Sequence, residues 1–147
     1  MYTLDASIFV RDLNPRDADH GLCRELLEHL AARGIPIIAP LLLLVEVAGT
    51  LSRELRDPMR GRIAVTILRT LPNLTLVALD ESLTQGALEV AADRALRGAD
   101  AVYVAVARQH ACTLASLDRE QRERGAAVVP TQTPAEALAD LGRGAPA

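Results

Sequence analysis

Short aliphatic segments alternate with longer helix-like segments along this chain of 147 residues. Aliphatic runs of this kind are typical of strands that are buried on both faces of a parallel sheet. Strands that alternate with helices predict an α/β fold with a mainly parallel central sheet. We expect strands at residues 2–4, 35–39, 74–79, 113–117 and 126–129.

Helices are expected between these strands, where apolar residues recur at helical spacing or where glycine or proline marks an end. The sequence has no internal repeat and no linker, so we expect one domain over residues 1–141 and a flexible tail at 142–147. The expected helices cover residues 8–13, 17–33, 40–55, 59–71, 82–96 and 134–141, with a short polar helix after residue 118.

The composition excludes several classes of function. All sixteen basic residues are arginine, which rules out Schiff-base chemistry and P-loop phosphate binding. The net charge is −3 and only three residues are aromatic, so neither bulk charge nor base stacking favours nucleic-acid binding. Cys23 and Cys112 lack metal-ligand spacing and are expected to be reduced core thiols. With no evident signal peptide or membrane-spanning run, we expect a soluble cytoplasmic protein.

Asp100 is the one charge in the apolar run Gly98–Ala107, GADAVYVAVA. The alternating valines fit a strand buried on both faces, but the alanine content and the length favour a buried helix, which we expect. An ionised carboxylate is costly to bury without a partner or a cation. Asp100 is therefore expected either at an exposed end of this element or facing a positive charge.

Glu46 is isolated in the same way, because it is the only charge between Arg33 and Arg53. On a helix it shares its face with apolar residues such as Leu43, so that face is expected to be buried. For Glu46 and Asp100 together, we expect a functional role.

Asp5, Asp80 and Asp118 each follow an expected strand. An aspartate between a strand and a helix is an ordinary helix N-cap, and Gln121 after Asp118 forms a variant of the capping box. The carboxyl ends of parallel strands are also where ligands bind. We interpret Asp80 as a cap and leave both interpretations open for Asp5 and Asp118.

Several carboxylates in one pocket repel one another, so either some are protonated or a hard cation neutralises them. Oxygen-only ligands favour Mg²⁺ or Mn²⁺, and the scattered His20, His29 and His110 give no support for zinc. A cation held by carboxylates, without a phosphate-binding glycine loop, suits hydrolysis of a phosphodiester.

Four segments resemble the four motifs of the PIN-domain family, in the same order: TLDAS at 3–7, VEVAGTL at 45–51, GADAVYVAVA at 98–107 and LASLD at 114–118. In spacing and size the chain is similar to bacterial VapC-type toxins. The resemblance implies a Rossmann-like three-layer α/β/α sandwich. It also implies an Mg²⁺- or Mn²⁺-dependent endoribonuclease that hydrolyses RNA with a metal-activated water.

The resemblance also assigns roles to individual residues. Ser7 and Ser116 stand in supporting positions, although Ser116 replaces the more usual Thr and the aromatic residue often found after the last acid is missing. A cognate antitoxin that covers the acidic cleft and a homodimer are further implications, and the apolar run 35–45 could serve as core or as interface. The positions of the family's metal-binding acids are held by Asp5, Glu46, Asp100 and Asp118.

Four arginines follow the Glu46 helix and are candidates for contacts with RNA backbone phosphates. The alternative is a solvated face on which these arginines pair with Glu54 and Asp57. The four are Arg53, Arg56, Arg60 and Arg62.

Other classes of protein fit less well. A phosphoacceptor receiver domain needs a lysine near its last strand, and a dinucleotide-binding domain needs a glycine-rich turn after its first strand; the chain has neither. Two alternatives stay open: a PIN-like nuclease that acts on DNA or in RNA processing, and a non-catalytic PIN-like binding module. The presence of all four acids argues against loss of catalysis.

Overall fold

The structure is a computed structural model that describes residues 1–143, and strands and helices alternate along it. Gly142 and Arg143 belong to the last helix, and residues 144–147 of the expected tail lie outside the described residues. The elements are β1 (Tyr2–Leu4), α1 (Ala6–Leu13), α2 (His20–Ala32), β2 (Ile37–Pro40), α3 (Leu42–Leu55), α4 (Pro58–Arg69), β3 (Leu74–Val77), α5 (Glu81–Arg94), α6 (Gly98–Gln109), β4 (Thr113–Ala115), α7 (Arg119–Gly125), β5 (Thr131–Gln132) and α8 (Pro134–Arg143).

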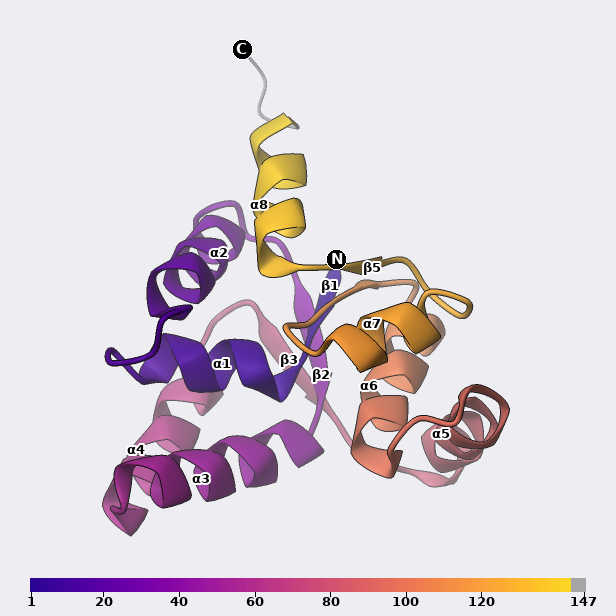
Figure 1. Ribbon diagram of the computed structural model, residues 1–147, viewed down its shortest axis with the longest axis horizontal. Helices are drawn as coiled ribbons and strands as arrows, with labels where there is room; N and C mark the ends of the chain where they lie inside the picture. The colour runs from indigo at the N-terminus through magenta and orange to yellow at the C-terminus, as the bar shows by residue number, and fades with distance from the viewer. Residues whose placement is uncertain (144–147) are drawn as a thin grey trace.

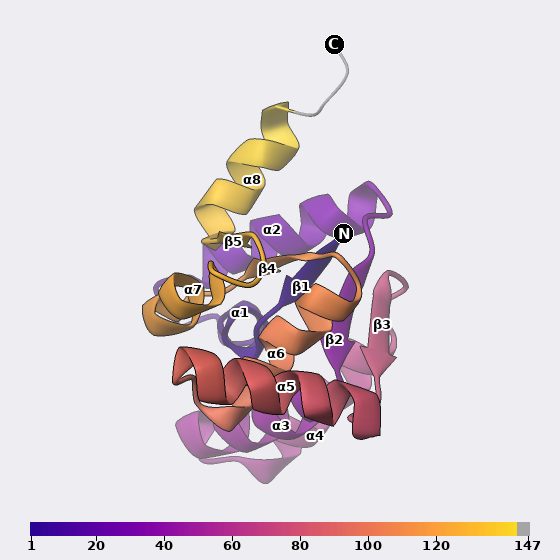
Figure 2. The same cartoon turned by 90° about the vertical axis from the view of Figure 1, so that its right-hand side faces the viewer.

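The described strands form one sheet in the order β3-β2-β1-β4-β5, and every pair of neighbours is parallel. Helices α1 to α4 lie on one side of the sheet and α5 to α7 on the other, as Figure 1 and the turned view in Figure 2 both show. Helix α8 packs against α2. The predicted three-layer α/β/α sandwich with a parallel sheet is therefore confirmed.

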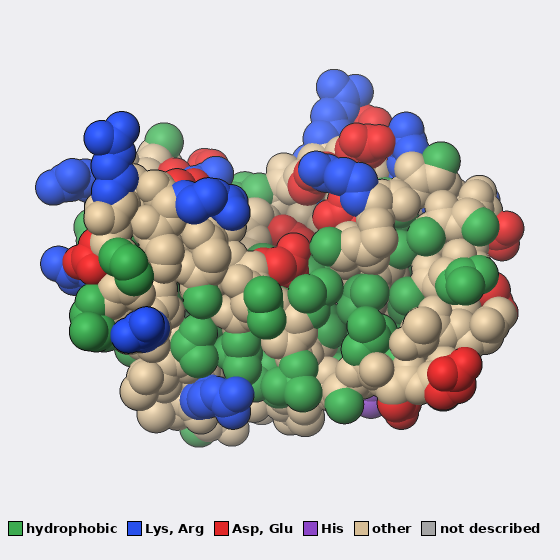
Figure 3. Space-filling model, turned by 90° about the horizontal axis from the view of Figure 1, so that it is seen from below, with side chains coloured by type: hydrophobic (Ala, Val, Ile, Leu, Met, Phe, Trp, Pro, Cys, Tyr) green, Lys and Arg blue, Asp and Glu red, His purple; other side chains and the backbone are tan. Residues whose placement is uncertain are grey.

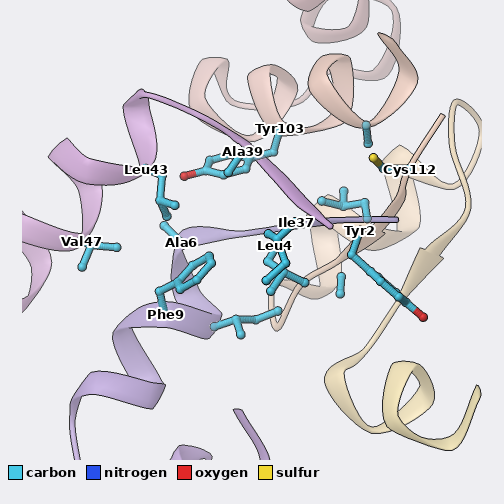
Figure 4. Packing of buried hydrophobic residues seen from close by; sticks show 14 of the residues in the cluster. Tyr2, Leu4, Ala6, Phe9, Ile37, Ala39, Leu43, Val47, Tyr103 and Cys112 are labelled. Atoms are coloured by element: carbon cyan, nitrogen blue, oxygen red, sulfur yellow. The ribbon is translucent and has the colours of Figure 1, made fainter. Parts of the chain in front are cut away.

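Helix α6 fills the centre of the second layer. It contacts β1, β2 and β4, and α5 covers its outer side. Every residue from Ala101 to Ala107 is buried, which confirms the helix expected for this apolar run and explains why the run carries so little charge. Figure 4 shows Tyr103 of this helix close to Ala39, with Leu4 and Phe9 among the other core side chains.

The apolar run 35–45 serves mainly as core. Ile37, Ala39 and Leu43 are buried, while Leu41 and Val45 are exposed, Val45 by 69%. The run thus leaves two aliphatic side chains on the surface at the start of α3.

The last strand was expected at residues 126–129, and this prediction is wrong. Val128 and Val129 belong to a turn in which both backbone N–H groups donate to the carbonyl of Gly125 at the end of α7. Val129 is buried, so its aliphatic side chain contributes to the core from the turn and not from the sheet. The strand is the more polar Thr131–Gln132, which pairs with β4 at the edge of the sheet.

Candidate metal-binding and active site

Asp5 and Asp118 lie where two neighbouring strands end. Asp5 directly follows β1, and Asp118 comes after β4, which pairs with β1. From these points the chain enters α1 on one side of the sheet and α7 on the other, and both aspartates line one cavity at this end of the strands. The topology therefore brings together two carboxylates that are 113 positions apart in the sequence.

Glu46 of α3 and Asp100 of α6 also line it, so all four predicted acids line one cavity of about 240 Å³. Figure 3 looks at this end of the molecule and shows acidic side chains in a central hollow, with hydrophobic side chains beside them. The other residues that line the cavity are Ala6, Ser7, Val10, Arg11, Thr50 and Arg97.

Asp5 and Asp118 are helix N-caps and also line the cavity, so capping does not exclude a role in the candidate site. Asp5 Oδ2 accepts from the backbone N–H of Ser7 at 2.9 Å, and Asp118 Oδ1 accepts from that of Gln121 at 2.9 Å. Asp80 caps α5 through the N–H of Leu83, as expected, and it does not line this cavity. Capping fixes the orientation of the two cavity carboxylates.

A core residue of α6 holds the side chain of Glu46. The hydroxyl of Tyr103 in α6 donates to Glu46 Oε2 at 2.6 Å. Burial raises the pKa of Glu46 above its ordinary value, the hydrogen bond from Tyr103 opposes this shift, and the charges of Asp5 and Asp100 add to it. Tyr103 in turn has a raised pKa because it is buried and faces these carboxylates, so it stays a neutral donor.

Arg97 bridges the other two carboxylates. Its Nε donates to Asp100 Oδ2 at 2.9 Å, and its Nη2 donates to Asp118 Oδ2 at 2.7 Å. Burial raises the pKa of Asp100, and Arg97 opposes that shift. The pKa of Asp118 is lowered, first by the N–H of Gln121 and also by Arg97. Of the two alternatives for Asp100, an exposed helix end or a facing positive charge, the structure shows the second, because Arg97 pairs with this side chain, which is only 16% exposed.

The donor set fits a hard divalent cation. The four acids offer only oxygen ligands, and Ser7 Oγ is buried in the cavity wall with no hydrogen-bond partner among the described residues. In residues 1–143 no three acidic, histidine or cysteine side chains are close enough together to hold an ion as they stand. The Ser7 N–H, the Tyr103 hydroxyl and Arg97 Nε each donate to one oxygen of these carboxylates.

Ser116 contacts the backbone of Asp118. It is fully buried, and its Oγ accepts from the N–H of Asp118 at 3.0 Å, which fixes the turn that presents this acid.

Gln121 has a second role beyond the expected capping. Its buried side chain donates to Asp5 Oδ1 and to the carbonyl of Asp100, both at 3.4 Å, and so links three of the acid-bearing segments.

The four arginines after Glu46 are not gathered at one place. Arg53 lies nearest to the cavity, since it donates to Thr50 Oγ1 in the cavity wall at 3.4 Å. Arg60 lies 3.8 Å from Asp57 and lines a separate, mainly apolar hollow of about 440 Å³ between the end of α1 and helices α3 and α4. Within residues 1–143, Arg53, Arg56 and Arg62 form no ion pair, and Glu54 pairs with Arg11 instead.

None of the helices in residues 1–143 combines the length and the apolar character that a membrane span requires.

The search of curated proteins found no match. Solved structures with the same fold do exist, and two of them show how far the likeness extends.

The toxin VapC20 of Mycobacterium tuberculosis, described as cleaving the sarcin–ricin loop, superposes with a TM-score of 0.71 at 22% identity. The match covers 85% of this chain and 95% of that one. VapBC2 from Rickettsia felis, solved with a DNA fragment from its promoter, gives a TM-score of 0.69 at 16% identity over 90% and 97% of the two chains. At such identities these structures establish a shared fold.

The family assignment comes from the sequence model of the PIN domain, which matches residues 2–127. This range contains all four cavity acids and every element from β1 to α7. The acids thus fall within the matched domain and not in an added segment. The chain belongs to the PIN-domain family.

Proposed function

We propose that this protein is a divalent-metal-dependent endoribonuclease and the toxin of a toxin–antitoxin pair. The observation that carries the proposal is the convergence of four carboxylates from four segments on one open cavity of a PIN domain. The likeness to VapC20, a sarcin–ricin loop cleaving toxin, supports RNA as the substrate. The free, buried Cys23 and Cys112 suit a reducing cytoplasm, where such a substrate is found.

The cofactor proposed is Mg²⁺ or Mn²⁺, held by Asp5, Glu46, Asp100 and Asp118, with Ser7 beside them. Such a cation would act as a Lewis acid that activates water and neutralises charge on a phosphodiester. Oxygen ligands alone, and no nearby histidine or cysteine among the cavity residues, favour these ions over zinc.

The chain's own groups prepare this site. The helix caps hold Asp5 and Asp118, and Ser116 and Gln121 fix the backbone between them. Tyr103 donates to Glu46 Oε2 and so fixes the orientation of this carboxylate in the cavity. Positioning of this kind lowers the cost of ordering the reacting groups.

The RNA backbone is proposed to approach along α3 toward the cavity. Arg53 is the best placed of the four candidate arginines, because it contacts the cavity residue Thr50 and has no acidic partner within residues 1–143. Arg56 and Arg62 are also without acidic partners there and remain candidates. Arg60 is the weakest candidate, since it faces a different hollow and lies near Asp57.

An antitoxin and a second copy of the chain are the proposed protein partners. The solved likenesses include VapBC2 and FitAcB from Neisseria gonorrhoeae, the latter with a TM-score of 0.69 at 18% identity over 91% and 98% of the two chains. Leu41 and Val45, both exposed at the start of α3, are the apolar side chains proposed for the homodimer contact.

The test is cleavage of total cellular RNA by the purified protein and by Asp100→Asn, with Mg²⁺ or Mn²⁺ present and the cleaved ends mapped. We expect the wild type to cut at defined sites and the variant to lose this activity while keeping its circular dichroism spectrum. Undiminished cleavage by a folded variant would overturn the proposal. Parallel reactions with DNA separate the alternative of a DNA nuclease, and an inert wild type would favour the non-catalytic module.

A further inference from the structure

Arg97 lines the cavity and contacts the carboxylates of two of the four acids. It lies in the connection between α5 and α6, and its guanidinium contacts Asp100 Oδ2 and Asp118 Oδ2 at 2.9 and 2.7 Å. Two different nitrogens, Nε and Nη2, make these contacts. The guanidinium therefore sits between carboxylates that would otherwise repel each other.

Arg97 is also the cation that balances these acids. Arg11 lines the same cavity, but its Nη1 lies 2.9 Å from Asp17 and 3.2 Å from Glu54, so its charge is directed elsewhere. Within residues 1–143 the four acids have no ion-pair partner except Arg97. The cavity as described thus carries an internal counter-charge.

Asp118 has no carboxylate oxygen free of a donor. Oδ1 accepts from the backbone N–H of Gln121 at 2.9 Å, and Oδ2 accepts from Arg97. The contact with Gln121 belongs to the cap of α7 and is fixed by the helix, whereas the contact with Arg97 comes from a long, 69% exposed side chain. For a cation to bind Asp118 at Oδ2, the side chain of Arg97 has to move away from this oxygen, and its exposure allows this movement.

From this arrangement we infer that Arg97 competes with the divalent cation for Asp100 and Asp118, and that it leaves both carboxylates when the cation binds. The inference rests on the metal site of the proposed function. A cation lies about 2.0–2.6 Å from its ligand oxygens, and a guanidinium on the same oxygens places two positive groups against each other. Exposed ion pairs are weak, so the divalent ion displaces the side chain at a modest cost.

The experiment is calorimetric titration of the metal-free protein with Mn²⁺ alone, for the wild type and three variants. Arg97→Gln should bind Mn²⁺ about two- to thirty-fold more tightly, the range that corresponds to two exposed ion pairs. Arg97→Lys keeps the charge but cannot bridge both acids as a guanidinium does, so its affinity should lie in between.

Arg119→Gln is the matched control, because it removes the same charge next to Asp118 from a residue that pairs with Glu123 instead. Its affinity for Mn²⁺ should stay close to that of the wild type. If Arg119→Gln tightens binding as much as Arg97→Gln, the effect is one of net charge and the inference is wrong. Unchanged or weaker binding by Arg97→Gln also overturns it.

A second readout follows the side chain itself. In the ¹H–¹⁵N spectrum of the wild type, the Nε–H resonance that disappears in Arg97→Gln identifies this arginine, and Mg²⁺ should shift it toward the position of a solvated guanidinium. A resonance that does not move on saturation with Mg²⁺ contradicts displacement. If the wild type binds Mn²⁺ but Arg97→Gln gains nothing, only this inference fails; if no variant binds Mn²⁺, the proposed metal site fails with it.

Discussion

The hydroxyl of Tyr103 donates a 2.6 Å hydrogen bond to Glu46 Oε2 and so joins the buried helix α6 to the acid of α3. Tyr103 is fully buried, and it is the one side chain between Asp100 and Arg108 that carries a polar atom. Its position one turn after Asp100 places it on the cavity side of the helix. Tyr103 is therefore a core residue that donates directly to an acid of the candidate site.

Replacing Tyr103 by Phe removes this donor with little change in volume. Because the hydrogen bond lowers the pKa of Glu46, its loss should raise that pKa further. The acid limb of the pH profile of RNA cleavage should move to higher pH, by about one unit or less. Tyr2→Phe is the control, since Tyr2 bonds Gln132 and not the site. A shift to lower pH, or an equal shift in both variants, would contradict this role.

Glu46 should cost the metal-free protein stability at neutral pH. Its pKa is raised in the folded state, so the protonated form favours folding; this contribution is complete below the unfolded pKa of about 4.3 and is lost as pH rises through the folded pKa. Metal-free Glu46→Gln should therefore melt at a higher temperature than the wild type at pH 7.5, and the difference should vanish near pH 4.

Glu136 provides a control of opposite sign. The backbone N–H of Thr133 lowers its pKa, so its contribution is present above the unfolded pKa and is lost as pH falls through the folded pKa. Glu136→Gln should lower the melting temperature at pH 7.5. Thermal denaturation followed by circular dichroism at both pH values checks the pair, and stabilisation by both substitutions would refute this account.

Mn²⁺ should raise the melting temperature by relieving repulsion among the four acids. At a concentration about 100 times Kd the gain is about 2.7 kcal/mol, which corresponds to roughly 5–10 °C for a chain of this length. Asp100→Asn should reduce the gain, because it removes one ligand. The absence of any shift at millimolar Mn²⁺ in the wild type would count against the metal site.

Gly61 sets the distance between α3 and α4. A Cβ at this position would lie 2.4 Å from the backbone oxygen of Ala48 and 2.3 Å from Ser52 Oγ. Since backbone cannot rotate away, Gly61→Ala should lower the free energy of unfolding by about 1–3 kcal/mol in urea denaturation. Gly49→Ala is the matched control in the same helix pair: its Cβ meets only Arg53 at 3.9 Å, so it should raise that free energy by about 0.5–1 kcal/mol.

Local patterns were enough to predict most of the fold. The apolar runs before Asp5 and Asp118 predicted strands, and the structure has β1 and β4 there. The isolation of Glu46 and Asp100 in apolar helices pointed to the cavity they share. The strand expected at 126–129 failed because valine marks burial as well as extended structure, and Val128 and Val129 lie in a turn.

The side chains that contact the four acids are harder to predict from the sequence. Arg97 and Asp100 are three positions apart, a spacing that brings side chains together at a helix start, but the contact with Asp118 depends on how β4 and α6 pack. Gln121 was assigned to a capping role, and its second role with Asp5 depends on burial against another strand. Such contacts arise from tertiary structure and leave no mark in local sequence.

The strand order has a consequence for the timing of activity during synthesis. Strand β1, which ends at Asp5, pairs with β4, and Tyr2 lies opposite Thr113. The β1–β4 pairing can therefore form only after most of the chain has left the ribosome. Until residue 118 has been made, a nascent chain has at most three of the four acids and lacks one wall of the cavity. Chain connectivity therefore keeps the candidate site incomplete until synthesis is nearly complete.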